Sequence, residues 1–327
     1  MTTRTVHTPY APRPRASRPG AGRRILRAVA LAATVPYLTL KAAWLAGSRV
    51  GIPDGSVLAE PGVFLTLANS VTLLMDACVI VLVLVLTRPW GLRVPSWTLT
   101  LPVFAASGLL TPILLGFPGQ LLIRALGFGA DPASGARRDP FLDPWVFHVV
   151  YGGFIVQGLA LAGLFVPYAR ERWGEDWGRR RPGAPRERPA PSTRAAAVAG
   201  AAVAAANLYW AFGGTAGMGV ERAASWSAEA GVVCAAHAVC ALAAGAGALL
   251  LASGRGLRAR WPAALAWIGS GAALGWGVWP MIASLGPQLD GGEGPSGAAQ
   301  LIYAGQMATG AFAAVVLTRF LTRRGEG

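Results

Sequence analysis

The stretch "AAAVAGAAVAAANLYWAFGGTAG", residues 195–217, is an apolar run that ends in Asn, Tyr, Trp and paired glycines. A looser copy of this ending, "LKAAWLAGSRVG", closes another apolar run at residues 40–51. When the two tryptophans are aligned, two glycines of each stretch also align, which gives the pairs Trp44/Trp210, Gly47/Gly213 and Gly51/Gly217. Tryptophan is enriched at membrane–water interfaces and glycine permits a tight turn. The pattern therefore predicts the outer end of a membrane helix, and it occurs twice.

The composition is that of an integral membrane protein. Hydrophobic residues make up 54% of the 327-residue chain and charged residues 13%, with a mean hydropathy of +0.46. Soluble domains carry about 25% charged residues. The net charge of +14 would suit a nucleic-acid-binding protein only if the basic residues gathered on one face. They lie between apolar runs instead, so we expect the lipid bilayer as the partner and no nucleic acid.

Eight apolar windows are long enough to cross a hydrocarbon core, which takes roughly 20 helical residues. These predicted spans are 25–47, 63–87, 98–118, 145–168, 195–213, 229–253, 262–285 and 298–318. Lipid offers no partners to exposed backbone groups, and alternating strand patterns are absent from the sequence, so helices are favoured over a barrel. We therefore predict an all-α integral membrane protein with eight transmembrane helices.

The arginines give the spans a direction. Segment 1–24 is rich in Arg and Pro and has no acidic residue, and segment 169–194 carries eight Arg. With eight spans, these segments and the C-terminal arginines all fall on one side, which the positive-inside rule makes cytoplasmic. We expect a multi-pass protein of a bacterial plasma membrane with both termini cytoplasmic. The Arg clusters could also contact anionic lipids.

Further matches suggest an internal duplication. "EPGV" at 60–63 resembles "EAGV" at 229–232, and in the last span of each half Tyr and two Gly recur in the pairs Tyr151/Tyr303, Gly153/Gly305 and Gly158/Gly310. Because four spans are an even number, two four-helix repeats would enter the membrane in the same direction. The expected organisation is a basic cytoplasmic tail (1–24), repeat 1 (25–168), a basic cytoplasmic linker (169–194), repeat 2 (195–320) and a C-terminal tail (321–327).

The motif "YWAFGG" at 209–214 resembles the signature of an uncharacterised family of polytopic bacterial membrane proteins, in which aromatic-Trp-Ala-x-Gly-Gly ends the first helix. The chain as a whole is similar to duplicated eight-helix relatives from high-GC bacteria, through "PYLTLKAAWLAG" at 36–47 and "NSVTLLMD" at 69–76. The first copy departs from the signature because Ser48 stands in place of the second Gly. The resemblance implies the topology and no activity.

A polar stripe in the first half needs a physical reason. Asp76, Thr72 and Asn69 fall at helical spacing on the second span, and an Asp within a span costs roughly 2.5–3.5 kcal/mol on insertion scales, so it should face the bundle. Lys41 and Trp44 share a face of the first span. We expect Lys41 to approach Asp76 and Asn69, which would form an ion pair or relay, or would only lock the two helices together.

The second half lacks this pair, because Asn207 takes the place of Lys41. Glu229 and His237 instead fall within one arc of the sixth span, where they would suit acid/base chemistry or a His that is simply a hydrogen-bonded core residue. Haem ligation by His148 and His237 would need a shared depth that the sequence does not support. With the cysteines at apolar positions and no paired-ligand spacing, we predict no metal site and no cofactor.

Three classes of function remain open: binding or transport of a small molecule or lipid between the repeats, a structural or signalling membrane partner, and an intramembrane acid/base enzyme acting on a lipid or isoprenoid. We rank them in that order, and no catalytic set stands out. The candidate binding residues are Lys41, Trp44, Asn69, Thr72, Asp76, Asn207, Trp210, Glu229 and His237.

Overall fold

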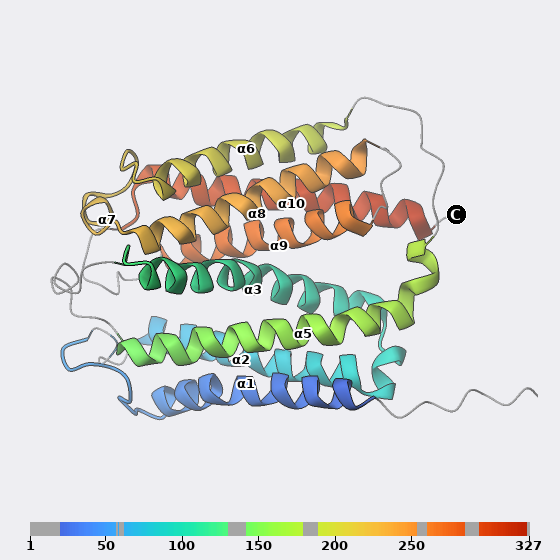
Figure 1. The fold of residues 1–327 in the computed structure, drawn as a ribbon, viewed down its shortest axis with the longest axis horizontal. Coiled ribbons are helices and arrows are strands. Elements are labelled where there is room, and N and C mark those ends of the chain that lie inside the picture. Colours follow the sequence, from blue (N-terminus) through green and yellow to red (C-terminus); the bar gives the residue numbers. More distant parts are fainter. Residues whose placement is uncertain are drawn as a thin grey trace, which may run out of the picture.

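The computed structural model is helical throughout the part of the chain that it describes (Figure 1). The described residues are 20–56, 58, 62–129, 142–178, 189–253, 260–284 and 294–325. In the first half they form α1 (Ala21–Leu45), α2 (Val63–Thr87), the 3-10 helix η2 (Pro89–Arg93), α3 (Ser96–Ala125) and α5 (Pro144–Gly178). In the second half they form α6 (Pro191–Ala211), the short α7 (Val220–Ala224), α8 (Ala228–Ala252), α9 (Arg260–Ala283) and α10 (Gly297–Gly325).

Six of the helices are long and apolar enough to cross a membrane, namely α1, α2, α3, α5, α8 and α10. The two remaining long helices, α6 and α9, have 21 and 24 residues. They are less hydropathic, because α6 is mostly Ala with an Arg, an Asn and a Trp, and α9 is rich in Gly and Trp. A multi-pass membrane protein is thus supported by six helices, whereas eight crossings require α6 and α9 to be counted as well.

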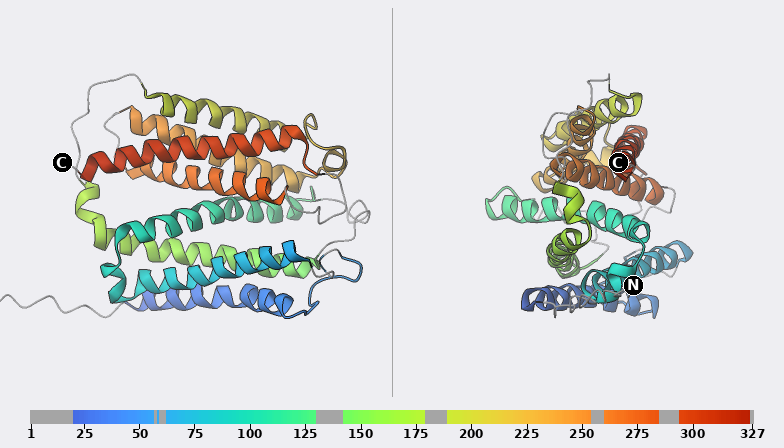
Figure 2. Two further views of the ribbon diagram at one scale, coloured as in Figure 1. Left: turned by 180° about the vertical axis from the view of Figure 1, so that it is seen from behind. Right: turned by 90° about the vertical axis from the view of Figure 1, so that its right-hand side faces the viewer.

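The long helices lie roughly side by side in two groups (Figures 1 and 2). In the second group α6 packs on α8, α8 on α9, α9 on α10 and α10 on α6, which closes a four-helix ring. The first group has the same order of neighbours, from α1 to α2, α3, α5 and back to α1, but α2 and α3 touch each other far less than α8 and α9 do. The first ring is therefore open between α2 and α3.

Side-chain size explains why one ring is closed and the other open. In the second half, small residues let helices approach closely: a Cβ on Gly247 would lie 2.4 Å from the backbone nitrogen of Ala266, and one on Gly269 would lie 2.3 Å from that of Ala244. Helix α2 carries branched aliphatic side chains along most of its length. Such side chains hold neighbouring helices apart, whereas small residues let them approach closely.

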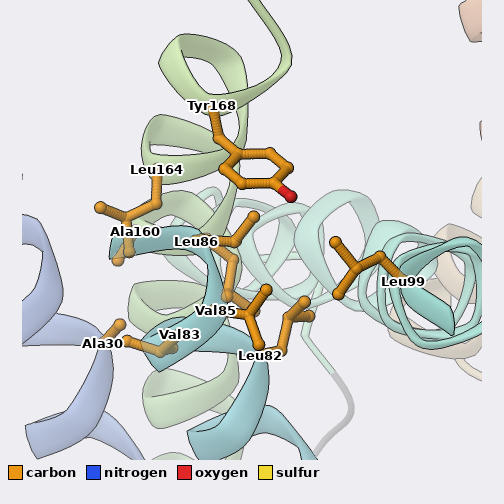
Figure 3. Packing of buried hydrophobic residues seen from close by; sticks show 10 residues of the cluster. Ala30, Leu82, Val83, Val85, Leu86, Leu99, Ala160, Leu164 and Tyr168 are labelled. Atoms are coloured by element: carbon orange, nitrogen blue, oxygen red, sulfur yellow. The ribbon is translucent and has the colours of Figure 1, made fainter. Parts of the chain in front are cut away.

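An apolar cluster closes the first half at one end (Figure 3). Ala30 of α1, Leu86 of α2, Leu164 and Tyr168 of α5 are each at most 1% exposed, and Leu99 of α3 joins them. These positions lie near the start of α1 and the end of α2, so the packed core occupies the end of the bundle where the chain's arginines gather.

Arginines tie that end together. Arg23 forms an ion pair with Glu171 at 3.1 Å, and Arg172 donates to the carbonyl oxygens of Gly91 and Val94 at 3.3 and 2.6 Å. The helix is longer than the predicted span of 145–168, because α5 continues through Arg172 to Gly178 and so includes the first part of the segment 169–194. The charged residues mark the end of the apolar span but do not end the helix.

The first helix of each group ends in the same way. The indole nitrogen of Trp44 donates to the carbonyl oxygen of Val50 at 2.8 Å, and that of Trp210 donates to Ala216 at 3.0 Å, six residues on in both cases. The glycines that follow have positive φ angles, which favour glycine: Gly47 (88°), Gly51 (73°), Gly213 (88°) and Gly217 (79°).

In each group, the second of the two glycines forms a hydrogen bond with the segment just before the fourth helix. The carbonyl oxygen of Gly51 accepts a hydrogen bond from the backbone of Asp143, just before α5. The carbonyl oxygen of Gly217 accepts one from the hydroxyl of Ser296, just before α10. The two helix ends are thus alike in their internal hydrogen bonds and in what they contact.

Helix α3 joins the two groups, since it packs on both α8 and α9. Gly108 and Gly271 meet at the crossing of α3 and α9, where a Cβ on Gly108 would lie 2.3 Å from the carbonyl carbon of Gly271. On either side, the indole nitrogen of Trp267 donates to the hydroxyl of Ser107 at 3.0 Å and that of Trp276 to the carbonyl oxygen of Leu109 at 3.1 Å. Backbone contact and two indole hydrogen bonds fix this crossing.

Candidate functional site

A cavity of about 1000 Å³ lies within the open first ring. Helices α1, α2, α3 and α5 line it, and Trp276 and Trp279 of α9 close its wall toward the second group. Leu82 at its inner end belongs to the packed core, so the cavity extends from the core toward the opposite end of the bundle. The sequence predicted a cavity between the two halves of the chain, whereas this one lies mainly inside the first group of helices.

Lys41 and Asn69 form the polar contact that joins α1 to α2 in this cavity. The Lys41 ammonium donates to Oδ1 of Asn69 at 2.7 Å. The same ammonium lies 5.1 Å from the ring centroids of both Tyr37 and Trp44, a cation–π arrangement on either side. The lysine charge is therefore held by an amide oxygen and two aromatic rings.

Asp76 lies deeper in the cavity wall and is only 6% exposed. It lines the same cavity as Lys41, but the described residues contain no ion-pair contact between the two. The expected contact of Lys41 with Asn69 is present, whereas the expected ion pair with Asp76 is not. The Oδ2 atom of Asp76 is buried without a hydrogen-bond partner in the described structure.

Gln157 of α5 is a site residue that the sequence reading missed. It lines the same cavity, is 2% exposed, and its side-chain nitrogen is likewise buried without a described partner. Buried polar groups normally find partners, so each exception asks for an explanation. A single amide in the otherwise apolar run "FIVQGLALAGLF" at 154–165 was the signal that could have found it.

Thr72, between Asn69 and Asp76 on α2, has a different role from its neighbours. Its hydroxyl donates to the carbonyl oxygens of Ala68 and Asn69 at 2.9 and 3.1 Å, within its own helix. It lines the cavity, but its hydroxyl hydrogen is donated to the backbone, as is common for Thr in helices.

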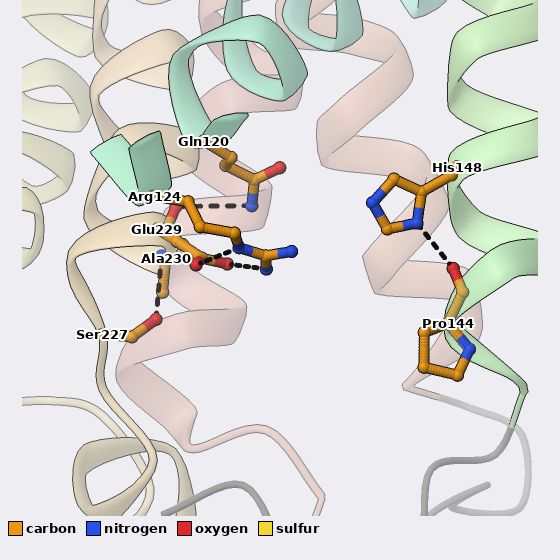
Figure 4. A network of polar contacts seen from close by, with 7 residues as sticks. All are labelled: Gln120, Arg124, Pro144, His148, Ser227, Glu229 and Ala230. Carbon is orange, nitrogen blue, oxygen red and sulfur yellow. Dashed lines mark hydrogen bonds and ion pairs between the residues drawn. The ribbon is translucent and has the colours of Figure 1, made fainter. Parts of the chain in front are cut away.

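A smaller cavity, of about 400 Å³, lies between the two groups. Arg124 of α3 holds both carboxylate oxygens of Glu229 on α8, at 2.9 and 2.7 Å, and His148 of α5 lies across from this pair (Figure 4). His237 also lines this cavity, with its ring 5.2 Å from that of Trp276. Glu229 and His237 thus share a wall, as their spacing indicated, but the acid is engaged by Arg124.

The two histidines do line one cavity, which the sequence did not lead us to expect. His148 Nδ1 lies 2.8 Å from the carbonyl oxygen of Pro144, and His237 is on a different helix. Among the described residues no group of three His, Cys, Asp or Glu side chains is placed to hold a metal ion.

Asn207 and Trp210 do not join the first-half cluster. Asn207 is 4% exposed and its side-chain nitrogen donates to the carbonyl oxygen of Val203, one turn back in α6. Trp210 is 5% exposed, and its indole nitrogen donates to the carbonyl oxygen of Ala216 at the end of the helix. In the second half, the counterparts of Lys41 and Trp44 are packing residues.

The geometry thus offers one large cavity whose mostly apolar wall carries two cationic side chains, one acidic side chain and two amides, namely Lys41, Arg49, Asp76, Asn69 and Gln157. A smaller cavity beside it carries two histidines. Phe147, Tyr151 and Trp276 line both. No family model matches this chain, and no curated protein or solved structure matches it.

Proposed function

We propose that this protein binds a small hydrophobic or amphiphilic molecule from the membrane in the cavity of its first half, as a carrier or transporter of that molecule. The observation that carries the proposal is the nine-tenths buried Asp76, which lines a cavity of about 1000 Å³ with one carboxylate oxygen left without a described partner. Ligand pockets are mostly apolar with a few placed polar groups, and this cavity has that character.

The architecture we propose is eight transmembrane helices in two parallel four-helix repeats. The matched hydrogen bonds of Trp44 and Trp210 support it, as do the equivalent anchors of Gly51 and Gly217 and the shared order of neighbouring helices. In this view one repeat became the closed scaffold and the other kept an open interior. The resemblance to duplicated membrane proteins of high-GC bacteria agrees with that division but names no ligand.

The proposed location is a bacterial plasma membrane, with the ends that carry Arg23, Arg172 and Arg319 in the cytoplasm. The start of α1 and the end of α10 lie at the same end of the bundle (Figure 1), as two cytoplasmic termini require, and clustered arginines favour that side. C-terminal fusions to a cytoplasm-active fluorescent protein and a periplasm-active phosphatase test this. Fluorescence with no phosphatase activity is expected, and the opposite pattern would reverse the topology.

Binding ranks above the two other classes for physical reasons. A structural partner needs no buried unpaired carboxylate, and leaving one costs several kcal/mol in an apolar surrounding. An acid/base enzyme would need a second group facing Asp76 with a pKa near the working pH, and the Lys41 ammonium, which lines the same cavity, is engaged by Asn69. A ligand that completes the hydrogen bonds of the cavity accounts for Asp76 with the fewest further assumptions.

The test is to fill the cavity without disturbing the fold. Ala105 of α3 lines it and is exposed, so the phenyl ring of Ala105→Phe has room to enter. Ala125, on the same helix, is exposed and lines neither cavity, which makes Ala125→Phe the matched control. Native mass spectrometry of protein released from its own membranes then measures the bound small molecules.

We expect the unmodified protein and Ala125→Phe to retain a bound species that Ala105→Phe has lost, with equal thermal stability for all three. If Ala105→Phe retains as much of the bound species as the unmodified protein does, the cavity is not the binding site. A protein that carries no bound species in any of the three forms would contradict the function.

A further inference from the structure

We infer that the ligand is a single hydrocarbon chain with a neutral hydroxyl head, which enters sideways from the bilayer between α2 and α3. This inference rests on the proposed function and adds the chemical class and the route. It follows from the polar groups of the cavity and from the side chains at its open edge.

The cavity wall reaches the outer surface of the bundle at the gap between α2 and α3. Leu74 and Met75 of α2 and Leu101 of α3 all line the cavity, yet they are 65%, 39% and 73% exposed. Side chains on a membrane helix that point outward face acyl chains. The cavity is therefore continuous with the hydrocarbon layer, and its entrance suits a molecule that is already dissolved there.

The size of the cavity fits one chain. About 1000 Å³ is the upper end of the ~300–1000 Å³ typical of small-molecule pockets. The wall is apolar from Leu74 at the edge to Leu82 at the packed core, with the polar groups of Asn69 and Asp76 along one side. A hydrocarbon chain can lie along the apolar wall while its head meets the polar side.

The charged side chains of the cavity favour a ligand whose head group is neutral. An anionic head at the unpartnered oxygen of Asp76 would be repelled by the carboxylate. A cationic head would be repelled by the Lys41 ammonium and the Arg49 guanidinium, since both side chains line the cavity. In a low-dielectric interior both repulsions are large. A neutral head avoids both.

Hydrogen bonding selects the group. Among the residues that line the cavity, the buried atoms without described partners are an acceptor, Oδ2 of Asp76, and a donor, the side-chain nitrogen of Gln157. A hydroxyl both donates and accepts, so it complements either atom, whereas a pure hydrocarbon leaves both unsatisfied. The head we infer is therefore an alcohol.

Three photoreactive probes that differ only in the head test this on the full-length protein in nanodiscs. Each carries the same diazirine-bearing hexadecyl chain, with an alcohol, a carboxylate or a trimethylammonium head, and labelled peptides are mapped by mass spectrometry. We expect the alcohol to label peptides of α2 and α3 that line the cavity at least about tenfold more than the two charged probes, since a charge-assisted hydrogen bond corresponds to such a factor. An isoprenoid alcohol probe alongside distinguishes a branched from a straight chain.

Substitutions then test which residue binds the head group and where the chain enters the cavity. Asp76→Leu should lower alcohol labelling about tenfold, with Ser70→Ala, an exposed position on the same helix outside the cavity, unchanged. Leu101→Trp should slow labelling at the entrance, with Leu115→Trp as its control because Leu115 is exposed but does not line the cavity.

The outcomes separate the two proposals. Equal labelling by all three heads, or preference for a charged one, would overturn the alcohol while leaving a binding cavity. Labelling that Leu101→Trp leaves as fast as before would overturn the lateral route. Absence of cavity labelling by every probe would overturn both this inference and the proposed function. Because the comparison of heads uses the unmodified protein, it decides the matter even where Asp76→Leu does not fold.

Discussion

Lys41 and Asn69 join the first two helices of the chain through a hydrogen bond of 2.7 Å between an ammonium and an amide oxygen. Asn69 is 8% exposed, so it has little access to other partners. The same lysine lies against the rings of Tyr37 and Trp44. One lysine side chain thus links α1 to α2 at the wall of the cavity.

Lys41→Met should lower the free energy of unfolding by about 2 kcal/mol, the typical cost of a lost hydrogen bond to a charged group. It also removes the positive charge that compensates Asp76. Thr39→Val is the control, because the Thr39 hydroxyl is exposed and bonds only its own helix. Titration with SDS in mixed micelles measures the free energy of unfolding of both variants. Equal stability of the two variants would mean that the contact does not hold the helices.

The helices themselves were predictable, because apolar runs between polar breaks give their limits. The second span was predicted at 63–87 and α2 is Val63–Thr87, since Gly62 and the Arg88–Pro89 step bound the run on either side. The predicted end of the fourth span at 168 was short. Beyond that residue Arg172 is held by the carbonyl oxygens of Gly91 and Val94, and such a tertiary contact leaves no trace in hydropathy.

The site was predictable only in part. Helical spacing correctly brought Lys41 to Asn69, because both positions and their depths follow from a regular helix. The spacing could not reveal that α2 stands away from α3, since this depends on the volumes of side chains from several helices together. For the same reason Asn207, which aligns with Lys41, turned out to bond its own helix in the tightly packed second half.

The helix-end turn offers a second prediction, with a control built into the sequence. Gly47 and Gly51 both have positive φ angles, so an Ala at either costs about 1–2 kcal/mol of backbone strain. A Cβ on Gly47 meets nothing within 4 Å, whereas one on Gly51 would lie 2.4 Å from Cγ2 of Val146. Gly51→Ala should therefore cost at least about 1 kcal/mol more than Gly47→Ala, as overpacking does.

Thermal unfolding of the two alanine variants in detergent measures this difference. Val146 is 1% exposed and branched at Cβ, so it cannot turn away freely. If Gly51→Ala is no less stable than Gly47→Ala, the contact between the turn and α5 is looser than described. The equivalent Gly217, whose Cβ would lie 3.0 Å from that of Ala298, should respond in the same direction.

A third prediction concerns the crossing that joins the two groups. Gly108→Ala places a methyl group against the backbone of Gly271 and should destabilise the protein by about 1–3 kcal/mol through overpacking. Gly116, two turns further along α3, has only ordinary contacts at 3.9 and 4.0 Å. Gly116→Ala should be neutral or stabilising, because Ala favours a helix over Gly by up to about 1 kcal/mol.

Limited proteolysis between the halves and thermal unfolding together check this pair of variants. Faster cleavage in segment 179–188 with Gly108→Ala alone would show that the crossing holds the two groups together. Equal behaviour of Gly108→Ala and Gly116→Ala would instead mean that Trp267 and Trp276, whose indoles donate to α3, are sufficient to hold it.

The last prediction concerns the charge pair that bridges α3 and α8. Arg124 presents two nitrogens to the two oxygens of Glu229, and the side chains are 56% and 14% exposed. Exposed ion pairs contribute roughly 0.2–1 kcal/mol, and a two-point geometry belongs at the upper end of that range. A double-mutant cycle with Arg124→Ala and Glu229→Gln should therefore give a coupling energy of about 1 kcal/mol that decreases with added salt.

The ion pair of Arg23 and Glu171, at 3.1 Å within the first half, is the control for this cycle. The coupling energies of both pairs should decrease with salt. Of the two pairs only Arg124–Glu229 joins the halves, so only its loss should speed proteolytic cleavage between them. A coupling energy near zero for Arg124 and Glu229 would leave the backbone crossing at Gly108 as the main link between the two groups.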